Sequence, residues 1–435
     1  MKQLATPIYM LIQSVFVIIQ YQIAKLHWGM DGLSQLILIL SAAIPFQLLN
    51  MGIGHYIYSI AGNTIGTKVQ IDGFKTALLL SSIGAFISAI ALKLFNPGLE
   101  SQFIIISAIY LVSTNLNGLL FFIYDGSGKS YLRSIMSGTI SLIFLSFAIF
   151  NKNSPVNPIV WFTLSSVLIT LVLSRPLISN WKQDGFDPFE MIKKGVNYNI
   201  MMLPSLSFDF IMKTSLNHFH PALLPLFDLI NKLLQQLNSL IIMLNQALAQ
   251  KIKNSDSIFI YKLALISGSA YFIFSIVISF ILPFILDYVG ITDTSNTYTV
   301  FWTVLIGWML NTISSPWYFT NIFQGKILKN TFGNIAILAT LILFGATSLF
   351  FDIPVYYSWS LALILGACVT VGYKNMICLF KSSPTSWTAL VCIFLVNLFI
   401  RQNIILSVVS GITAMFIFLK TLRSSQINRE VQING

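Results

Sequence analysis

Apolar residues dominate long stretches of the chain, and short polar segments separate them. A helix of about 20 mainly apolar residues crosses a membrane core about 30 Å thick. Fourteen stretches meet this description, although the thirteenth is short and ends at Arg401, so that a single hairpin in place of the last two would leave twelve helices. The predicted membrane helices are 4–24, 33–60, 74–95, 102–123, 133–150, 157–176, 195–218, 222–250, 258–286, 298–323, 331–350, 354–380, 386–400 and 403–420.

The longest polar connection, residues 177–194, divides these helices into two sets of six followed by an extra pair. Many transporters consist of paired repeats with the substrate path between them. We therefore predict an all-α polytopic membrane protein with two six-helix lobes around a central polar cavity. The predicted parts are an N-terminal lobe over 1–180, a cytoplasmic linker over 181–194, a C-terminal lobe over 195–380, and an additional helix pair with a cytoplasmic tail over 381–435.

Composition and charge support a membrane protein. Hydrophobic residues make up 56% of the chain and charged residues only 9%, against about 25% charged in soluble domains. With the N-terminus inside, 19 of the 25 Lys and Arg residues fall in inside segments and four outside, as expected of cytoplasmic loops. We therefore predict a multi-pass membrane protein with both termini in the cytoplasm. The basic residues are scattered, which argues against a nucleic-acid partner.

Two acid–base pairs fall inside predicted membrane helices. Asp209 and Lys213 are four residues apart in 195–218, and Asp228 and Lys232 are four apart in 222–250, so each acid can meet a base on one helix face. Ionisable groups at bilayer depth are costly and often mark a substrate or ion path. Mutual neutralisation during insertion is the alternative interpretation.

Amides extend this pattern along the helix 222–250, where polar residues recur in steps of three, four or seven. Such a stripe must face partner helices or a hydrated cavity, and we favour the cavity. Amides and hydroxyls can hydrogen-bond sugars, and further amides occur in the first two predicted helices. The predicted substrate-binding residues of the cavity are Lys232, Asp228, Lys213, Asp209, Asn231, Gln235, Asn238, Asn50, Gln47 and Gln20.

Motifs for enzymatic, nucleotide or metal chemistry are incomplete. Residues 126–130 contain Gly-Lys-Ser, but Ile123 stands where a phosphate-binding loop has its first glycine, and no strand is predicted before it. A tight turn is the better interpretation. His218 and His220 lack nearby carboxylates or cysteines, and two ligands seldom suffice for a metal site. We therefore predict no cofactor, no metal and no enzymatic activity.

The residues around the second predicted helix carry a family resemblance. The stretch Gly32-Leu33, followed by Leu48-Leu49-Asn50-Met51-Gly52-Ile53-Gly54, resembles the Wzx-type flippases of polysaccharide repeat units, a branch of the multidrug/oligosaccharidyl-lipid/polysaccharide (MOP) exporters. That family often has Leu-Leu-Asp-x-Gly-Leu-Gly there, so Asn50 stands where an acid is expected. Asp209 matches an acid that is common in the family's seventh helix. Tyr198 and Asn199 lie earlier in the same predicted helix, in the segment that leads up to this position in family members.

The resemblance implies a V-shaped pair of helical bundles with alternating access. It implies a flippase that moves an undecaprenyl-pyrophosphate-linked oligosaccharide from the cytoplasmic to the periplasmic leaflet of a bacterial inner membrane. The product would be O-antigen or another surface polysaccharide of the lipopolysaccharide or capsule type. A polysaccharide polymerase and a chain-length regulator would be partners, beside membrane lipids. We expect Lys232 and Lys213 to attract the anionic substrate, with Asp228 and Asp209 orienting them or sensing protons.

Two other function classes remain open at this point. A multidrug or cation antiporter of the same superfamily would have a buried acid without a lysine four residues away. A polytopic polysaccharide polymerase would have a long outer loop with arginine or histidine, whereas the predicted outer loops are short and Arg401 is their one arginine.

Overall fold

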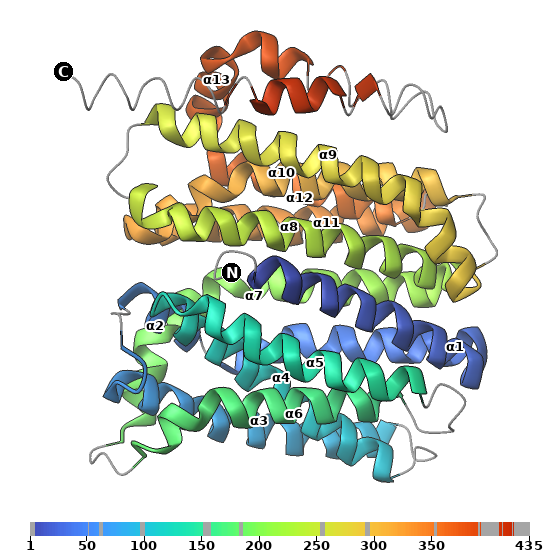
Figure 1. Ribbon diagram of the computed structural model, residues 1–435, viewed down its shortest axis with the longest axis vertical. Coiled ribbons are helices and arrows are strands. Elements are labelled where there is room, and N and C mark those ends of the chain that lie inside the picture. The colour runs from blue at the N-terminus through green and yellow to red at the C-terminus, as the bar shows by residue number, and fades with distance from the viewer. Residues whose placement is uncertain are drawn as a thin grey trace. The chain divides into compact units, whose positions relative to one another are not determined.

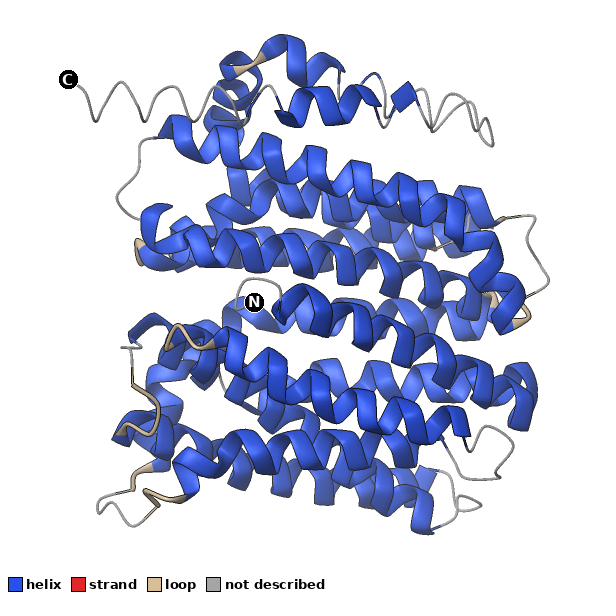
Figure 2. Ribbon diagram, in the orientation of Figure 1, coloured by secondary structure: helices blue, strands red, loops and turns tan. Residues whose placement is uncertain are grey.

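Helices joined by short loops and turns make up the part of the chain that the structure describes, and no strand occurs there (Figure 2). The structure is a computed structural model. The described residues are 5–50, 52–60, 64–95, 101–150, 158–181, 186–252, 257–291, 296–351, 355–389, 392, 409–410, 412–419 and 421.

The chain divides into two compact units, residues 1–214 and 215–435 (Figure 1). The first unit comprises α1 (Ala5–Phe46), the 3-10 helix η1 (Gln47–Asn50), α2 (Ile53–Ile60), α3 (Lys68–Phe95), α4 (Ser101–Gly126), α5 (Ser130–Phe150), α6 (Pro158–Ile178) and most of α7 (Pro188–Phe219). The second comprises η2 (Pro221–Leu223), α8 (Leu224–Ile252), α9 (Ser257–Val289), α10 (Thr297–Phe323), α11 (Ile327–Phe351), α12 (Tyr356–Val371) and α13 (Tyr373–Ser382). The predicted lobe boundary at 181–194 stays a prediction.

The nine predicted helices from 74–95 to 331–350 are confirmed as α3 to α11, with ends that differ by a few residues. The largest extension is at α7, which begins at Pro188 rather than at 195. Asp187 Oδ1 accepts hydrogen bonds from the backbone N–H groups of Phe189 and Glu190, which is the arrangement of a helix N-cap. The predicted helix 386–400 lies mostly outside the described residues, whereas the described residues of 403–420, which are 409–410 and 412–419, are helical.

The predicted helix 33–60 is wrong as a continuous element. Helix α1 ends at Phe46, η1 follows, and Gly52 has φ 68° before α2 begins. A Cβ at Gly52 would lie 2.2 Å from the carbonyl oxygen of Gly195 and 2.5 Å from the amide nitrogen of Asn199. The close approach of the α7 backbone and the left-handed torsion angle both require glycine here.

Two further boundaries differ from the prediction. The predicted break between 4–24 and 33–60 contains one residue with non-helical torsion angles inside α1, Gly29. The predicted helix 354–380 is also wrong as one straight span, because Gly372 has φ 80° and α12 and α13 meet there at 92°. Glycine permits this torsion angle without the strain that a Cβ would add.

Several described helices are long and apolar enough to cross a membrane. Five meet that condition by length and composition, and the bent α12–α13 pair would be a sixth. The five are Lys68–Ile90, Ile104–Gly126, Ile159–Ile178, Ile258–Val289 and Ile327–Gly345. The chain is therefore an all-α polytopic membrane protein, as predicted.

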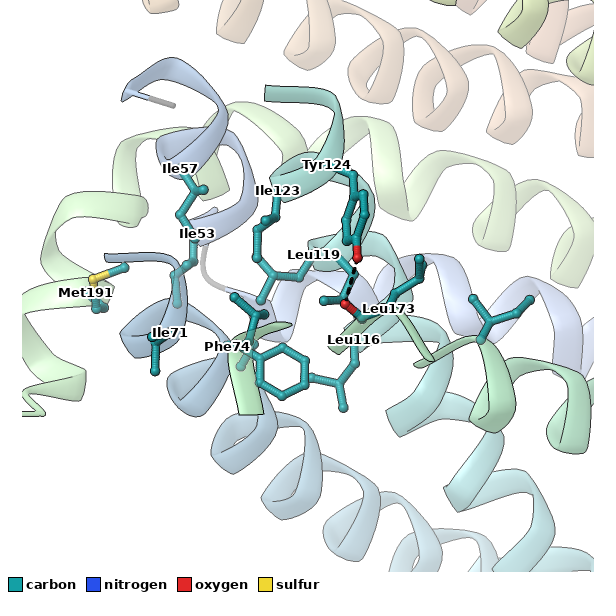
Figure 3. Close-up of a cluster of buried hydrophobic side chains, with 14 of the residues drawn as sticks. Ile53, Ile57, Ile71, Phe74, Leu116, Leu119, Ile123, Tyr124, Leu173 and Met191 are labelled. Carbon is teal, nitrogen blue, oxygen red and sulfur yellow. Dashed lines mark hydrogen bonds between the residues drawn. The ribbon is translucent and has the colours of Figure 1, made fainter. Parts of the chain in front are cut away.

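A hydrophobic cluster holds the broken second span in the first unit (Figure 3). Ile53 and Ile57 of α2 pack with Phe74 of α3 and with residues of α4, α6 and α7. The Tyr124 hydroxyl donates a hydrogen bond to the carbonyl oxygen of Leu173, at 3.1 Å (Figure 3). The cluster thus satisfies a polar atom of α4 while it fixes α2 against its neighbours.

In the second unit, small residues bring α11 and α12 together. A Cβ at Gly333 would lie 2.0 Å from Thr370 Oγ1, and one at Gly366 would lie 2.2 Å from Ile337. Small residues allow such close backbone approach between membrane helices. The Trp359 ring of α12 then packs edge-on against Phe227 of α8 and Trp308 of α10. This packing positions α8 and its polar residues against α10.

Candidate functional site

Helix α7 carries a buried ion pair. Lys213 Nζ lies 2.5 Å from Asp209 Oδ2, one helical turn away, and the side chains are 0% and 12% exposed. The spacing predicted this contact. Nine residues before Lys213, Pro204 lies inside the same helix, where its ring removes one backbone hydrogen bond. The pair therefore lies on a helix with a built-in site for bending.

Helix α8 carries the second acid and base. Asp228 is fully buried, whereas Lys232 and Gln235 are partly exposed. Lys232 follows Asp228 by one turn, so both lie on one side of the helix. A cation that keeps some exposure beside a buried acid can still reach an anion that approaches the helix. In this unit, Lys232 and Gln235 are the predicted site residues with accessible side chains.

The amides of α8 divide into two sets. Asn231, Asn238 and Asn245 are seven residues apart, and all three are buried. Each contacts α10 through a hydrogen bond. Trp308 Nε1 donates to Asn231 Oδ1 at 2.8 Å, Thr312 Oγ1 donates to Asn238 Oδ1 at 2.6 Å, and Asn245 Nδ2 donates to Ser315 Oγ at 2.7 Å. Ser267 Oγ of α9 also donates to Asn245 Oδ1, at 3.1 Å.

We call these three asparagines and their partners on α10 the amide ladder. Hydrogen bonds between buried polar groups hold membrane helices together, and the ladder does so between α8 and α10. It accounts for Asn231 and Asn238 by packing, and the cavity role predicted for these two stays a prediction. The α10 partners Trp308 and Thr312 were not selected from the sequence, although their spacing of four places them on one helix face.

Asn50 lies in the interruption of the second span. Its Nδ2 donates to the carbonyl oxygen of Asn115 in α4 at 3.3 Å, and Asn115 Nδ2 donates to Ser81 Oγ in α3 at 2.5 Å. An ionised carboxylate has no proton to donate. The amide at Asn50 therefore fits its position beside a carbonyl, where the resembling family has an acid.

Gln20 of α1 is fully buried. Neither of its amide atoms has a hydrogen-bond partner within the residues that the structure describes. A buried amide without a partner costs free energy, so it is a candidate for contact with a ligand. The side chain of Gln47, the other predicted amide of this region, lies outside the described residues.

The candidate residues therefore form two groups. The first unit contains Gln20, Asn50, Asp209 and Lys213, and the second contains Asp228, Asn231, Lys232, Gln235 and Asn238. A cavity that joins the two groups stays a prediction.

The other chemical motifs of the sequence are the histidines and the Gly-Lys-Ser turn. Among the described residues, no group of three or more His, Cys, Asp or Glu side chains could hold a metal ion. Residues 127–129 form the tight turn expected between α4 and α5, with Gly128 at φ 68°. The His55 ring lies 4.3 Å from the Phe122 ring and stacks on Tyr198 at 6.3 Å. It packs where α2 meets α4 and α7.

Solved structures with a similar fold are known. No family model and no curated protein matches the sequence. Among solved structures, the lipid II flippase MurJ in an inward closed conformation is similar, with TM-score 0.60 and 13% identity over 96% of this chain and 97% of that one.

Two MATE transporters are similar to the same degree. An inward-facing multidrug resistance MATE family transporter of the MOP superfamily has TM-score 0.61 and 11% identity, covering 86% of this chain and 96% of its own. The eukaryotic MATE transporter AtDTX14 has TM-score 0.59 and 14% identity, covering 97% and 98%. The chain thus has the fold shared by MurJ and the MATE transporters of the MOP superfamily.

Proposed function

We propose that the protein is a flippase. Its substrate is an undecaprenyl-pyrophosphate-linked oligosaccharide, which it moves from the cytoplasmic to the periplasmic leaflet of a bacterial inner membrane for surface polysaccharide synthesis. The fold is that of proven transporters, and MurJ, similar over nearly the full length of both chains, is by name a flippase of a lipid-linked substrate. The proposal also rests on the resemblance around Asn50 and Gly52.

The observation that carries the proposal is the pair of lysines on α7 and α8. A lysine inside a membrane helix is costly, yet Lys213 is fully buried beside Asp209 and Lys232 follows Asp228 by one turn. Cations at these positions attract a pyrophosphate and repel a cationic drug. The acids keep the lysines neutralised and oriented until substrate arrives.

In this proposal, the lobes are residues 1–180 and 195–380, and the oligosaccharide passes between them while the lipid tail stays in the bilayer. Gln235 and Gln20 supply amides that can hydrogen-bond sugar hydroxyls. The additional region 381–435 follows the second lobe. A polymerase and a chain-length regulator would act on the product at the outer face.

A complementation experiment tests the proposal. The gene is deleted in its host and restored as wild type, Lys232→Ala, Asp228→Ala, Lys213→Ala, or the exposed control Lys194→Ala, at matched membrane levels. Surface polysaccharide is then measured. We expect loss in the deletion strain, recovery with wild type and with the control, and strong loss with the three α7 and α8 variants.

Two outcomes would count against different parts of the proposal. Wild-type polysaccharide in all three variants would remove the site assignment. Unchanged polysaccharide in the deletion strain, together with efflux of ethidium by the wild-type protein in vesicles, would instead support a cation antiporter with the same fold.

A further inference from the structure

A groove runs along α3, α4 and α6 in the first unit, outside the residues assigned to transport. Its larger part is a cavity of about 920 Å³, lined by Phe74, Leu78 and Leu116, by residues of α6, and by residues 179–181 that follow α6. A second cavity of about 380 Å³ continues along the same helices and shares Leu116, Thr170 and Leu171 with the first. We call this continuous hollow the α3–α6 groove.

The groove opens onto an apolar surface. Leu171 and Ile178, which line it, are 56% and 48% exposed. Ile83, Phe86 and Ile87 of α3 are also exposed, at 50%, 69% and 60%. In a protein that spans a membrane, exposed apolar residues of this kind face lipid. The occupant of the groove must therefore come from the bilayer and be apolar along most of its length.

One end of the groove is polar and basic. Lys75 Nζ donates a hydrogen bond to the Trp181 carbonyl oxygen at 3.0 Å, and it lies 5.1 Å from the Trp181 ring and 5.6 Å from the Phe186 ring. These contacts hold the ammonium beside a residue of the groove lining. An ammonium has three donors, so it can still bind an anion. Asp72, one turn before Lys75, is buried, whereas Lys75 stays partly exposed.

A second cation lies at the same end. Arg175 is exposed and stands four residues after Leu171 and three before Ile178. It therefore shares the helix face of these two groove residues. In the predicted topology, the segment that follows α6 leads into the cytoplasmic linker, which would place both cations at the level of the cytoplasmic headgroups.

We propose that the α3–α6 groove binds an anionic phospholipid of the cytoplasmic leaflet. One acyl chain lies along Phe74, Leu116 and Leu171, and the headgroup phosphate contacts Lys75 and Arg175. The apolar lining of the α3–α6 groove fits the acyl chain, and the two cations complement the charge of the phosphate. The site is independent of the transport residues, because it uses none of the side chains assigned to the substrate.

Tryptophan quenching by brominated lipids tests this site, since Trp181 lines the groove. The full-length protein is reconstituted in phosphatidylcholine bilayers that contain increasing fractions of phosphatidylglycerol with brominated chains. The chain has eight tryptophans, so the signal of Trp181 is the difference between wild type and Trp181→Phe. We expect this signal to be quenched at lower mole fractions of brominated phosphatidylglycerol than of brominated phosphatidylcholine.

Charge variants identify the headgroup contacts. Lys75→Gln and Arg175→Gln should each raise the phosphatidylglycerol fraction needed for half-quenching by about fivefold, the effect of one cation near an anionic headgroup. Lys75→Arg, which keeps the charge, should restore the wild-type value. Lys93→Gln, near the opposite end of α3, is the matched control and should change nothing.

Three results would overturn the proposal. The first is the absence of Trp181-dependent quenching with either lipid. The second is equal quenching by both lipids that the charge variants do not change, which would mean contact with bulk lipid only. The third is full displacement of brominated phosphatidylglycerol by undecaprenyl phosphate in amounts equal to the protein, which would assign the groove to a prenyl chain.

Discussion

Helix α7 contains two acid–base pairs with the same spacing in opposite surroundings. Near its start, Lys194 contacts Glu190, and the two side chains are 38% and 57% exposed. Near its end, Lys213 contacts Asp209, and these side chains are 0% and 12% exposed. Both pairs place an acid one turn before a base on a single helix, so spacing alone does not distinguish them.

The difference shows that burial, rather than the pairing itself, gives such a contact its weight. An exposed pair exchanges water for a contact of nearly equal free energy. In a buried pair, removal of one partner leaves the other charge without a partner and without water to solvate it, which is costly. The following predictions test whether the two pairs of α7 differ in this way.

The largest effect should come from Lys213→Ala. This change removes the ammonium that pairs with the Asp209 carboxylate in a buried position, and breaking a buried ion pair costs about 3 to 5 kcal/mol. We expect the free energy of unfolding, measured by steric trapping in bicelles, to fall by that amount. A fall in the free energy of unfolding no larger than that of Lys194→Ala would show that burial does not distinguish the two pairs.

Asn245→Leu should have an intermediate effect. It removes hydrogen bonds to Ser315 and Ser267 from the amide ladder but leaves no buried charge. Interhelical hydrogen bonds in membranes are worth about 1 to 2 kcal/mol at most. We expect a fall of about 1 to 2 kcal/mol in the free energy of unfolding, with surface polysaccharide per folded molecule unchanged. Loss of transport with an unchanged free energy of unfolding would show that Asn245 contacts the substrate instead of serving helix packing.

The double variant Asp209→Leu with Lys213→Leu should be less destabilised than Lys213→Ala. Replacement of a buried ion pair by apolar residues is often neutral or stabilising, because both desolvation costs disappear. We expect a free energy of unfolding within about 1 kcal/mol of wild type, and loss of surface polysaccharide. Full transport by this variant would mean that the pair serves only to neutralise charge during insertion.

Lys194→Ala should have the smallest effect, with no measurable change in thermal unfolding at neutral pH. The hydrogen bond to Glu190 raises the pKa of Lys194. A raised pKa means that the contact contributes fully below the ordinary pKa of lysine and is lost only as the pH rises above it. The contact therefore contributes fully near pH 7, but an exposed pair is worth so little that the unfolding curves of variant and wild type should coincide there. A clear difference there would contradict the assignment of this pair to solvent.

The helices themselves could be predicted from the sequence because the signal is local. Each apolar stretch from 74–95 to 331–350 contains enough residues to specify a helix without reference to the rest of the chain. The breaks could not be predicted in this way. Gly52 interrupts the second span because the α7 backbone passes beside it, and that contact joins residues far apart in sequence. Gly372 likewise gives no local signal of a 92° bend.

The candidate site was predictable to a similar degree. The contact of Asp209 with Lys213 follows from their spacing, because both ends of the pair lie on one helix. The polar residues of α8 were ambiguous, since spacing shows that they share a face but not what covers it. The structure supplies Trp308 and Thr312 as partners for Asn231 and Asn238, and leaves Lys232 and Gln235 partly exposed.

The turn inside α1 has a mechanical consequence. Gly29 is a single residue with φ 68° and ψ −164° between two helical segments. Among the described residues, no atom from elsewhere in the chain lies within 4 Å of a Cβ built there. A single residue, instead of a flexible loop, therefore connects the two segments. A displacement of one segment must be transmitted to the other or absorbed by the two torsion angles of Gly29. The proposed flippase would open alternately to the two sides of the membrane. The two segments of α1 would then rotate relative to each other about Gly29.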